Sequence, residues 1–186
     1  MTRGQAWSLL TEFTRGDGLR KHAHAVETSM RAYAARFGED SERWGIAGML
    51  HDFDYEMHPR APQHPVKGAE ILLARGVERE VVYAILAHAD YSGMPRVSRL
   101  DKALYACDEL TGFVHACALV RPGKVITGLE AASVRKKLKD KGFARTVNRD
   151  DVYRGAAELG VDLDAHIAFV VEALATVAPE IGLARA

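Results

Sequence analysis

The chain has 186 residues, of which 48% are hydrophobic, so one compact domain over residues 1–186 can fill its core without disulfides or a structural metal. Lysine plus arginine and aspartate plus glutamate are balanced at 25 each, which gives no indication of a nucleic-acid polymer or an acidic membrane as a partner. No window approaches the roughly 18 apolar residues of a membrane span and the N-terminal stretch carries no export signal, so we expect a cytoplasmic protein with Cys107 and Cys117 reduced.

Helical spacing of apolar residues dominates the chain, and glycine and proline fall between the helical segments. We predict eight helices, over residues 4–14, 19–37, 41–51, 66–75, 78–89, 98–119, 130–141 and 149–177. The last helix is expected to break near Gly160. Residues 82–86 alone would suit a strand, but they lie in a run with an acidic first turn and helical spacing. The predicted fold class is therefore all-α, a compact multi-helix bundle.

Two neighbouring predicted helices each direct a histidine toward the core. His22 lies on the apolar face of its helix, whereas His24 points the other way among charged neighbours. His51 follows Gly48, and that small residue lets another helix approach closely. Asp52 comes at the helix end, where its side chain can turn back toward the same point.

Two later helices add a histidine and a carboxylate. His88 continues the apolar face of its helix, and Asp108 lies on the shoulder of an apolar stripe that includes Leu104. Cys107 lies on that stripe, where apolar surroundings raise a thiol pKa, so we predict a packing residue and not a nucleophile. Each inward histidine or carboxylate alone is also typical of a hydrogen-bonded core residue. Together, imidazole and carboxylate groups that converge in a bundle core suit a divalent first-row metal.

The order of these residues resembles the H…HD…D signature of the HD-domain superfamily of metal-dependent phosphohydrolases. The signature residues are His22, His51, Asp52 and Asp108. The stretches LRKHAHAVETSMRAYA, AGMLHDFDYE, AEILLARG and ALYACDELTGFV are also similar to small uncharacterised bacterial HD hydrolases. The resemblance implies an all-α HD core over about residues 19–115, in which the four side chains hold a metal, and a C-terminal helical extension over about residues 116–186.

Members of that superfamily with two metals add two histidines between the doublet and the last aspartate. This chain offers His64 and His88, with Asp52 as the bridge between the metals. We expect Pro59 and Pro62 to hold the intervening loop out of helix, so that His64 folds back over Asp52. The resemblance therefore implies one or two divalent ions per chain, and the ligands do not distinguish manganese, iron, nickel, cobalt, magnesium or zinc.

The activity that the resemblance implies is hydrolysis of a phosphomonoester or nucleotide-type small molecule by a metal-activated water. Asp52 would take part in catalysis as a ligand of the metal. Asp54 would accept a proton or orient the water, or alternatively it only caps the next turn. Four further side chains are candidates for binding the phosphorylated substrate, or are ordinary surface residues: Lys67, Lys102, Arg99 and His58. The sequence also leaves open whether the protein forms a homodimer.

Two alternatives to phosphate hydrolysis stay open. One is a di-iron oxygenase of the same superfamily that acts on a small polyol or phosphonate, and the other is a non-catalytic ligand-binding domain. A cyclic-dinucleotide phosphodiesterase is not favoured, because Phe53 and Asp54 follow the doublet where those enzymes carry a glycine and a lysine. Only GMP, at 93–95, stands where they carry a fuller GYP element.

Overall fold

The computed structural model describes residues 1–184 and confirms the predicted all-α class: over this range it contains nine α-helices, two short 3₁₀ helices and no strand. The α-helices are α1 (Arg3–Phe13), α2 (Asp17–Phe37), α3 (Ser41–Leu50), α4 (Gln63–Ala74), α5 (Arg79–Ala87), α6 (Arg99–Leu119), α7 (Ala131–Leu138), α8 (Arg149–Leu159) and α9 (Leu163–Ala175). The 3₁₀ helices are η1 (Asp90–Ser92) and η2 (Pro122–Lys124). No helix in the described part of the chain is long and apolar enough to cross a membrane.

Local capping signals explain where the helices begin and end. The α6 helix begins at a capping box, in which the Ser98 hydroxyl accepts from the Asp101 backbone nitrogen and the Asp101 carboxylate accepts from the Ser98 backbone nitrogen. The predicted break near Gly160 separates α8 from α9. Gly160 ends α8 with a left-handed φ of 76°, and Asp162 caps α9 by accepting from the Ala165 backbone nitrogen.

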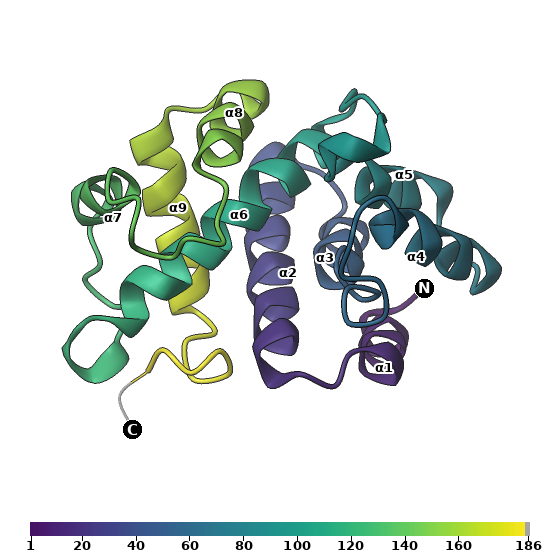
Figure 1. Ribbon diagram of the computed structural model, residues 1–186, viewed down its shortest axis with the longest axis horizontal. Helices are drawn as coiled ribbons and strands as arrows, with labels where there is room; N and C mark the ends of the chain where they lie inside the picture. Colours follow the sequence, from purple (N-terminus) through teal and green to yellow (C-terminus); the bar gives the residue numbers. More distant parts are fainter. Residues whose placement is uncertain (185–186) are drawn as a thin grey trace.

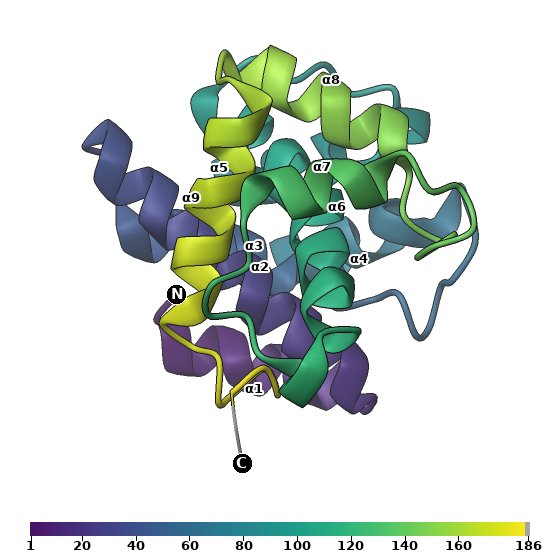
Figure 2. The same ribbon diagram turned by 90° about the vertical axis from the view of Figure 1, so that its left-hand side faces the viewer.

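Two hydrophobic clusters share α6. The first contains apolar residues of α1 to α5 and of the N-terminal half of α6 as far as Cys107. The second begins on α6 at Leu110 and contains apolar residues of α7, α8, α9 and the segment that follows α9. Figure 1 shows α6 crossing from one half of the molecule to the other, and Figure 2 shows α7, α8 and α9 around its C-terminal half. Asp108 therefore lies between the two clusters, where a carboxylate interrupts a mostly apolar helix.

Two glycines allow the helices that carry the site to approach closely. A Cβ at Gly48 would lie 2.9 Å from the backbone nitrogen of Glu27, so α3 packs directly against the α2 backbone. A Cβ at Gly155 would lie 2.7 Å from the Cα atom of Ala106, so α8 packs against α6 in the same way. The first approach brings His51, one turn after Gly48, to the side of α2.

Candidate metal centre

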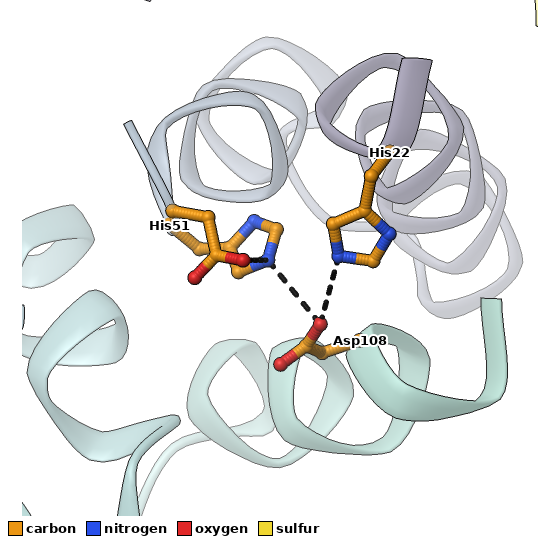
Figure 3. A group of neighbouring side chains, drawn as sticks. His22, His51 and Asp108 are labelled. Carbon is orange, nitrogen blue, oxygen red and sulfur yellow. Dashed lines mark hydrogen bonds and ion pairs between the residues drawn. The ribbon is translucent and has the colours of Figure 1, made fainter. Parts of the chain in front are cut away.

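His22, His51 and Asp108 come from three helices and point toward one another (Figure 3). His22 lies on the second turn of α2, His51 directly follows α3, and Asp108 lies midway along α6. The Asp108 Oδ1 atom is 3.0 Å from His22 Nε2 and 3.3 Å from His51 Nε2. Asp52 adds a carboxylate oxygen 3.5 Å from the same His51 nitrogen. One ligand atom from each of these four residues, the first ligand group, lies within 4.8 Å of the others.

Asp52 also faces a second ligand group, made of Asp52, His64 and His88. The Asp52 Oδ1 atom is 3.1 Å from His64 Nε2 and 3.6 Å from His88 Nε2. His64 has a non-helical ψ of 138°, so it precedes the regular turns of α4 and folds back over Asp52, as the prolines of this loop led us to expect. The structure thus brings all six predicted metal ligands together, with Asp52 common to both groups.

In three of the four histidines, an acceptor fixes the Nδ1 atom and leaves the Nε2 lone pair free to bind a metal. The pairs are His51 Nδ1 with the Gly48 carbonyl, His88 Nδ1 with the Ile85 carbonyl and His64 Nδ1 with the Asp54 carboxylate. Because a carbonyl or carboxylate oxygen only accepts, Nδ1 carries the proton in the neutral ring. Such outer contacts are the usual way in which proteins orient histidine ligands.

The environment of His51 shows that the residues fit a metal ion. Its Nε2 atom is buried and has no hydrogen-bond partner among the described residues, although it lies 3.3 Å from Asp108. With the proton on Nδ1, the Nε2 lone pair faces the carboxylates of Asp52 and Asp108, which is unfavourable unless a cation lies between them. Imidazole nitrogens with carboxylate oxygens are a donor set that suits divalent first-row metals.

Without a metal, protons stabilise the same arrangement. Burial by itself would lower the pKa of His51, but Asp52 and Asp108 raise it well above its usual value. Burial also opposes the charge on His64, yet hydrogen bonds to Asp52 and Asp54 raise the pKa of His64 to about 9. A metal must displace these protons to bind, so its affinity should increase with pH.

Asp54 is completely buried, and its contacts differ from those of a proton acceptor in a cleft. Its Oδ1 atom accepts from His64 Nδ1 at 2.7 Å and its Oδ2 atom accepts from the Gly68 backbone nitrogen at 2.9 Å. Both oxygens are therefore occupied by the protein. These contacts are those of a carboxylate that orients the His64 ring and binds the backbone of α4, closer to the alternative of a capping residue, and the role as a base near the water stays a prediction.

A cleft of about 500 Å³ opens over the two ligand groups. Its outer wall contains residues that the sequence reasoning did not identify: Tyr55, Asp90, Tyr91, Tyr105, Glu109, Thr146, Asn148 and Asp151. Glu109 directly follows the predicted ligand Asp108, so its position in the sequence could have indicated that it lies near the site. Burial and the charge of Asp108 raise the pKa of Glu109 to about 8. Asn148 and Asp151 reach the cleft only through the packing of α8 on α6, which no sequence pattern indicates.

The cleft lining contains none of the four side chains that were predicted to bind substrate, namely Lys67, Lys102, Arg99 and His58. Lys67 forms a surface ion pair with Glu70 at 3.0 Å. Arg99 lies on the first turn of α6, 3.7 Å from Glu39, and about two and a half turns before Asp108, on the opposite side of the helix. Closeness to a ligand in the sequence thus did not bring these side chains to the cleft lining, and their role in binding substrate stays a prediction.

Comparison with known proteins gives one family and two similar proteins. The family model described as HD domain matches residues 19–112, which contain both ligand groups. The Ribonuclease Y of Desulfotalea psychrophila is 30% identical over 146 residues, which cover 73% of this chain and 26% of that protein. The Ribonuclease Y of Oleidesulfovibrio alaskensis is 31% identical over 93 residues, which cover 50% of this chain and 18% of that protein. The chain thus spans about a quarter or less of the length of these relatives, and no solved structure matches it.

Proposed function

Because the chain belongs to the HD-domain family, we propose that it is a metal-dependent phosphohydrolase that acts on a phosphomonoester or nucleotide-type small molecule. The observation that carries this proposal is the buried His51 Nε2 atom, which faces two carboxylates at the base of the cleft and lacks a hydrogen-bond partner among the described residues. A cleft of about 500 Å³ has the size of a small-molecule site.

Each of the two ligand groups would bind one metal ion. His22, His51, Asp52 and Asp108 would hold one divalent ion, and Asp52, His64 and His88 would hold a second, so we propose one or two ions per chain. Bound there, a divalent ion supplies a water of lowered pKa and withdraws charge from the phosphoryl oxygens. The protein fixes the ligand rings through their Nδ1 contacts, so the site is oriented before substrate enters.

The test is a hydrolysis assay on metal-free protein reconstituted separately with manganese, iron, nickel, cobalt, magnesium and zinc. We expect cleavage of at least one phosphomonoester in a broad panel, loss of activity with a chelator, and recovery when metal is restored. Elemental analysis of the same samples controls for occupancy. Metal-replete protein that cleaves no phosphate ester, but consumes oxygen in the presence of a polyol or phosphonate, would instead support the oxygenase alternative.

RNA is a second candidate substrate, because the two similar proteins are named Ribonuclease Y. Proteins that bind nucleic acids usually place lysine and arginine along the phosphate backbone. Here the formal net charge is zero and no lysine or arginine of residues 1–184 lines the cleft, which favours a small substrate. The panel should therefore include single-stranded RNA, and cleavage of RNA faster than of every monoester would replace the small-molecule proposal.

A further inference from the structure

Among the described residues, the outer wall of the cleft offers carboxyl, hydroxyl and amide groups but no lysine or arginine. Beyond the two ligand groups, the polar lining includes Asp90, Tyr91, Tyr105, Glu109, Asn148 and Asp151. Carboxyl, hydroxyl and amide groups both donate to and accept from the hydroxyl groups of a neutral ligand, so this wall suits an uncharged, hydroxylated ligand. Neither protonation state of a carboxyl group supplies a cation, so the absence of positive charge does not depend on pH.

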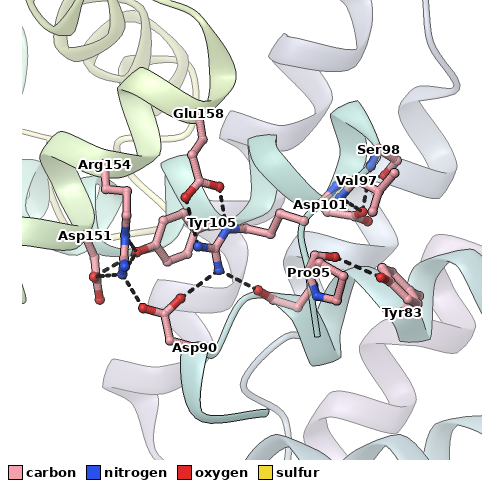
Figure 4. A network of polar contacts seen from close by, with 12 residues as sticks. Tyr83, Asp90, Pro95, Val97, Ser98, Asp101, Tyr105, Asp151, Arg154 and Glu158 are labelled. Atoms are coloured by element: carbon pink, nitrogen blue, oxygen red, sulfur yellow. Dashed lines mark hydrogen bonds and ion pairs between the residues drawn. The ribbon is translucent and has the colours of Figure 1, made fainter. Parts of the chain in front are cut away.

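Arg96 and Arg154 contact residues of this wall but are not among the residues that line the cleft. Figure 4 shows Arg154 beside Asp90, Tyr105 and Asp151. Arg96 donates to Asp90 at 2.8 Å, and its guanidinium lies 3.6 Å from the centre of the Tyr105 ring. Arg154 contacts Asp90, Tyr105 and Asp151. Both guanidinium groups are thus committed to protein partners, and their charge is offset by the carboxylates that they bind.

Two exposed aromatic side chains complete the cleft. Tyr55 is 41% exposed and Tyr91 is 51% exposed, although both line the cleft. A tyrosine ring offers an apolar face together with a hydroxyl group that donates or accepts a hydrogen bond. These groups suit the ring of a sugar or a base, whose faces are apolar and whose edges carry hydroxyl or amino groups.

We propose, on the premise of the phosphohydrolase function above, that the cleft selects phosphate monoesters whose remainder is uncharged and carries hydroxyl groups. The bound metal would compensate the charge of one phosphate. A second phosphate would lie where the described lining holds no lysine or arginine, and the nearby Arg96 and Arg154 already bind carboxylates, so its charge would lose water without gaining a charged partner. Sugar monophosphates and nucleoside monophosphates belong to the accepted class, whereas bisphosphates, polyphosphates and nucleic acids do not.

The test measures binding, so that it does not depend on turnover. Metal-loaded protein is titrated by calorimetry with two matched pairs of phosphonate analogues, one of a hexose monophosphate and its bisphosphate and one of a nucleoside monophosphate and its bisphosphate. The hydrolase reaction does not cleave their carbon–phosphorus bond. We expect the monophosphonate of at least one pair to bind at least about 10-fold more tightly than its bisphosphonate. Equal or tighter binding of the bisphosphonates, or no binding of any analogue, would overturn the proposal.

A charge-adding variant tests the physical cause. Thr146→Lys places a cation on an exposed position of the cleft wall and should improve binding of the bisphosphonate relative to the monophosphonate by about 10-fold. Thr127→Lys makes the same change on an exposed turn that does not line the cleft, and should leave the ratio unchanged. Asp151→Asn should move the ratio in the same direction as Thr146→Lys, because it removes a carboxylate that offsets the charge of Arg154. A ratio that neither cleft variant changes would contradict the proposal.

The outcomes separate this inference from the proposed function. If the analogues bind as expected but no phosphate ester in the panel is cleaved, the hydrolase proposal fails and the specificity stands. If monoesters and bisphosphates are cleaved with equal kcat/KM and bind equally well, the hydrolase proposal stands and the specificity fails.

Discussion

Two completely buried histidines contact α6 at positions two residues apart, and their surroundings are opposite in character. His51 faces the carboxylate of Asp108 on one side and that of Asp52 on the other. His166, on α9, donates from Nε2 to the Ala106 carbonyl at 3.0 Å, and its Nδ1 atom accepts from the Tyr33 hydroxyl at 2.6 Å. Both nitrogens of His166 therefore have neutral partners.

The pKa values follow from these partners. Burial lowers the pKa of His166 to about 4, because no negative charge offsets the loss of solvent. Burial acts on His51 in the same direction, but Asp52 and Asp108 outweigh it and raise the pKa. An inward histidine is therefore no sign of a metal site by itself. What distinguishes the two is a nitrogen that faces carboxylates while the other nitrogen is already bonded.

Removing the shared carboxylate should have the largest effect. Asp52→Ala takes a ligand from both groups, so we expect the metal content to fall from about two ions, or one, to near zero, with a loss of hydrolysis of more than about 1,000-fold. His166→Gln is the matched control, since it removes a buried imidazole that has no carboxylate partner. Elemental analysis of both variants measures the metal content. A metal-free His166→Gln variant and a metal-loaded Asp52→Ala variant would contradict the assignment of Asp52 as a metal ligand.

The second ligand group can be emptied separately. His64→Ala and His88→Ala should each lower the metal content from about two ions to about one while the fold survives, because the first group keeps its own four ligands. Circular dichroism checks the fold and elemental analysis gives the stoichiometry. If the parent protein never exceeds one ion and both variants match it, these histidines would be substrate contacts or core hydrogen-bond partners.

Asp54→Asn should have a smaller effect of the same kind. The amide can still accept from His64 Nδ1, but it loses its charge, and its nitrogen would face the Gly68 backbone donor. Loss of such an outer contact typically weakens metal binding by about 10- to 100-fold. Calorimetric titration with metal measures this weakening at the second site, with the first site as an internal reference. Unchanged affinity at both sites would mean that Asp54 does not orient the ligand.

His166 should make the metal-free protein sensitive to mild acid. Its folded-state pKa of about 4 lies below the unfolded value of about 6.5, so the unfolded chain takes up a proton first as the pH falls. Stability is then lost between about pH 6.5 and pH 4, by up to about 3 kcal/mol. Urea unfolding at several pH values measures the slope, and His166→Gln should make it shallower. An identical slope in parent and variant would contradict the assignment.

Cys107→Ser should change activity least. The thiol is completely buried, and burial raises its pKa far above the usual value, so no thiolate is available at neutral pH. We expect full hydrolysis at saturating metal, with a loss of stability of about 1–2 kcal/mol from the added hydroxyl. Steady-state kinetics with metal analysis is the measurement. A collapse in kcat with metal still bound would make Cys107 part of the chemistry.

Most of the helices could be predicted because helix formation is largely local. Apolar periodicity and glycine or proline breaks placed each helix, and the observed ends differ from the predicted ones by at most three residues. The start of α4 was missed by three residues, because Gln63 and His64 precede a proline and do not continue an apolar pattern. The division of the C-terminal segment into α8 and α9 followed from Gly160, whose left-handed conformation ends a helix.

The sequence by itself also determined the six metal-ligand candidates: inward helix faces and helix ends indicated five of them, and the resemblance to two-metal family members added His64. Only the tertiary structure decided what surrounds them. The Asp54 carboxylate binds His64. Asn148 and Asp151 reach the cleft from the start of α8, and the side chains predicted to bind substrate do not line it. The physical reason is that helical periodicity fixes which residues share a face of one helix. Which faces meet depends on packing between helices, as at Gly155, where α8 closes on α6 and completes the cleft.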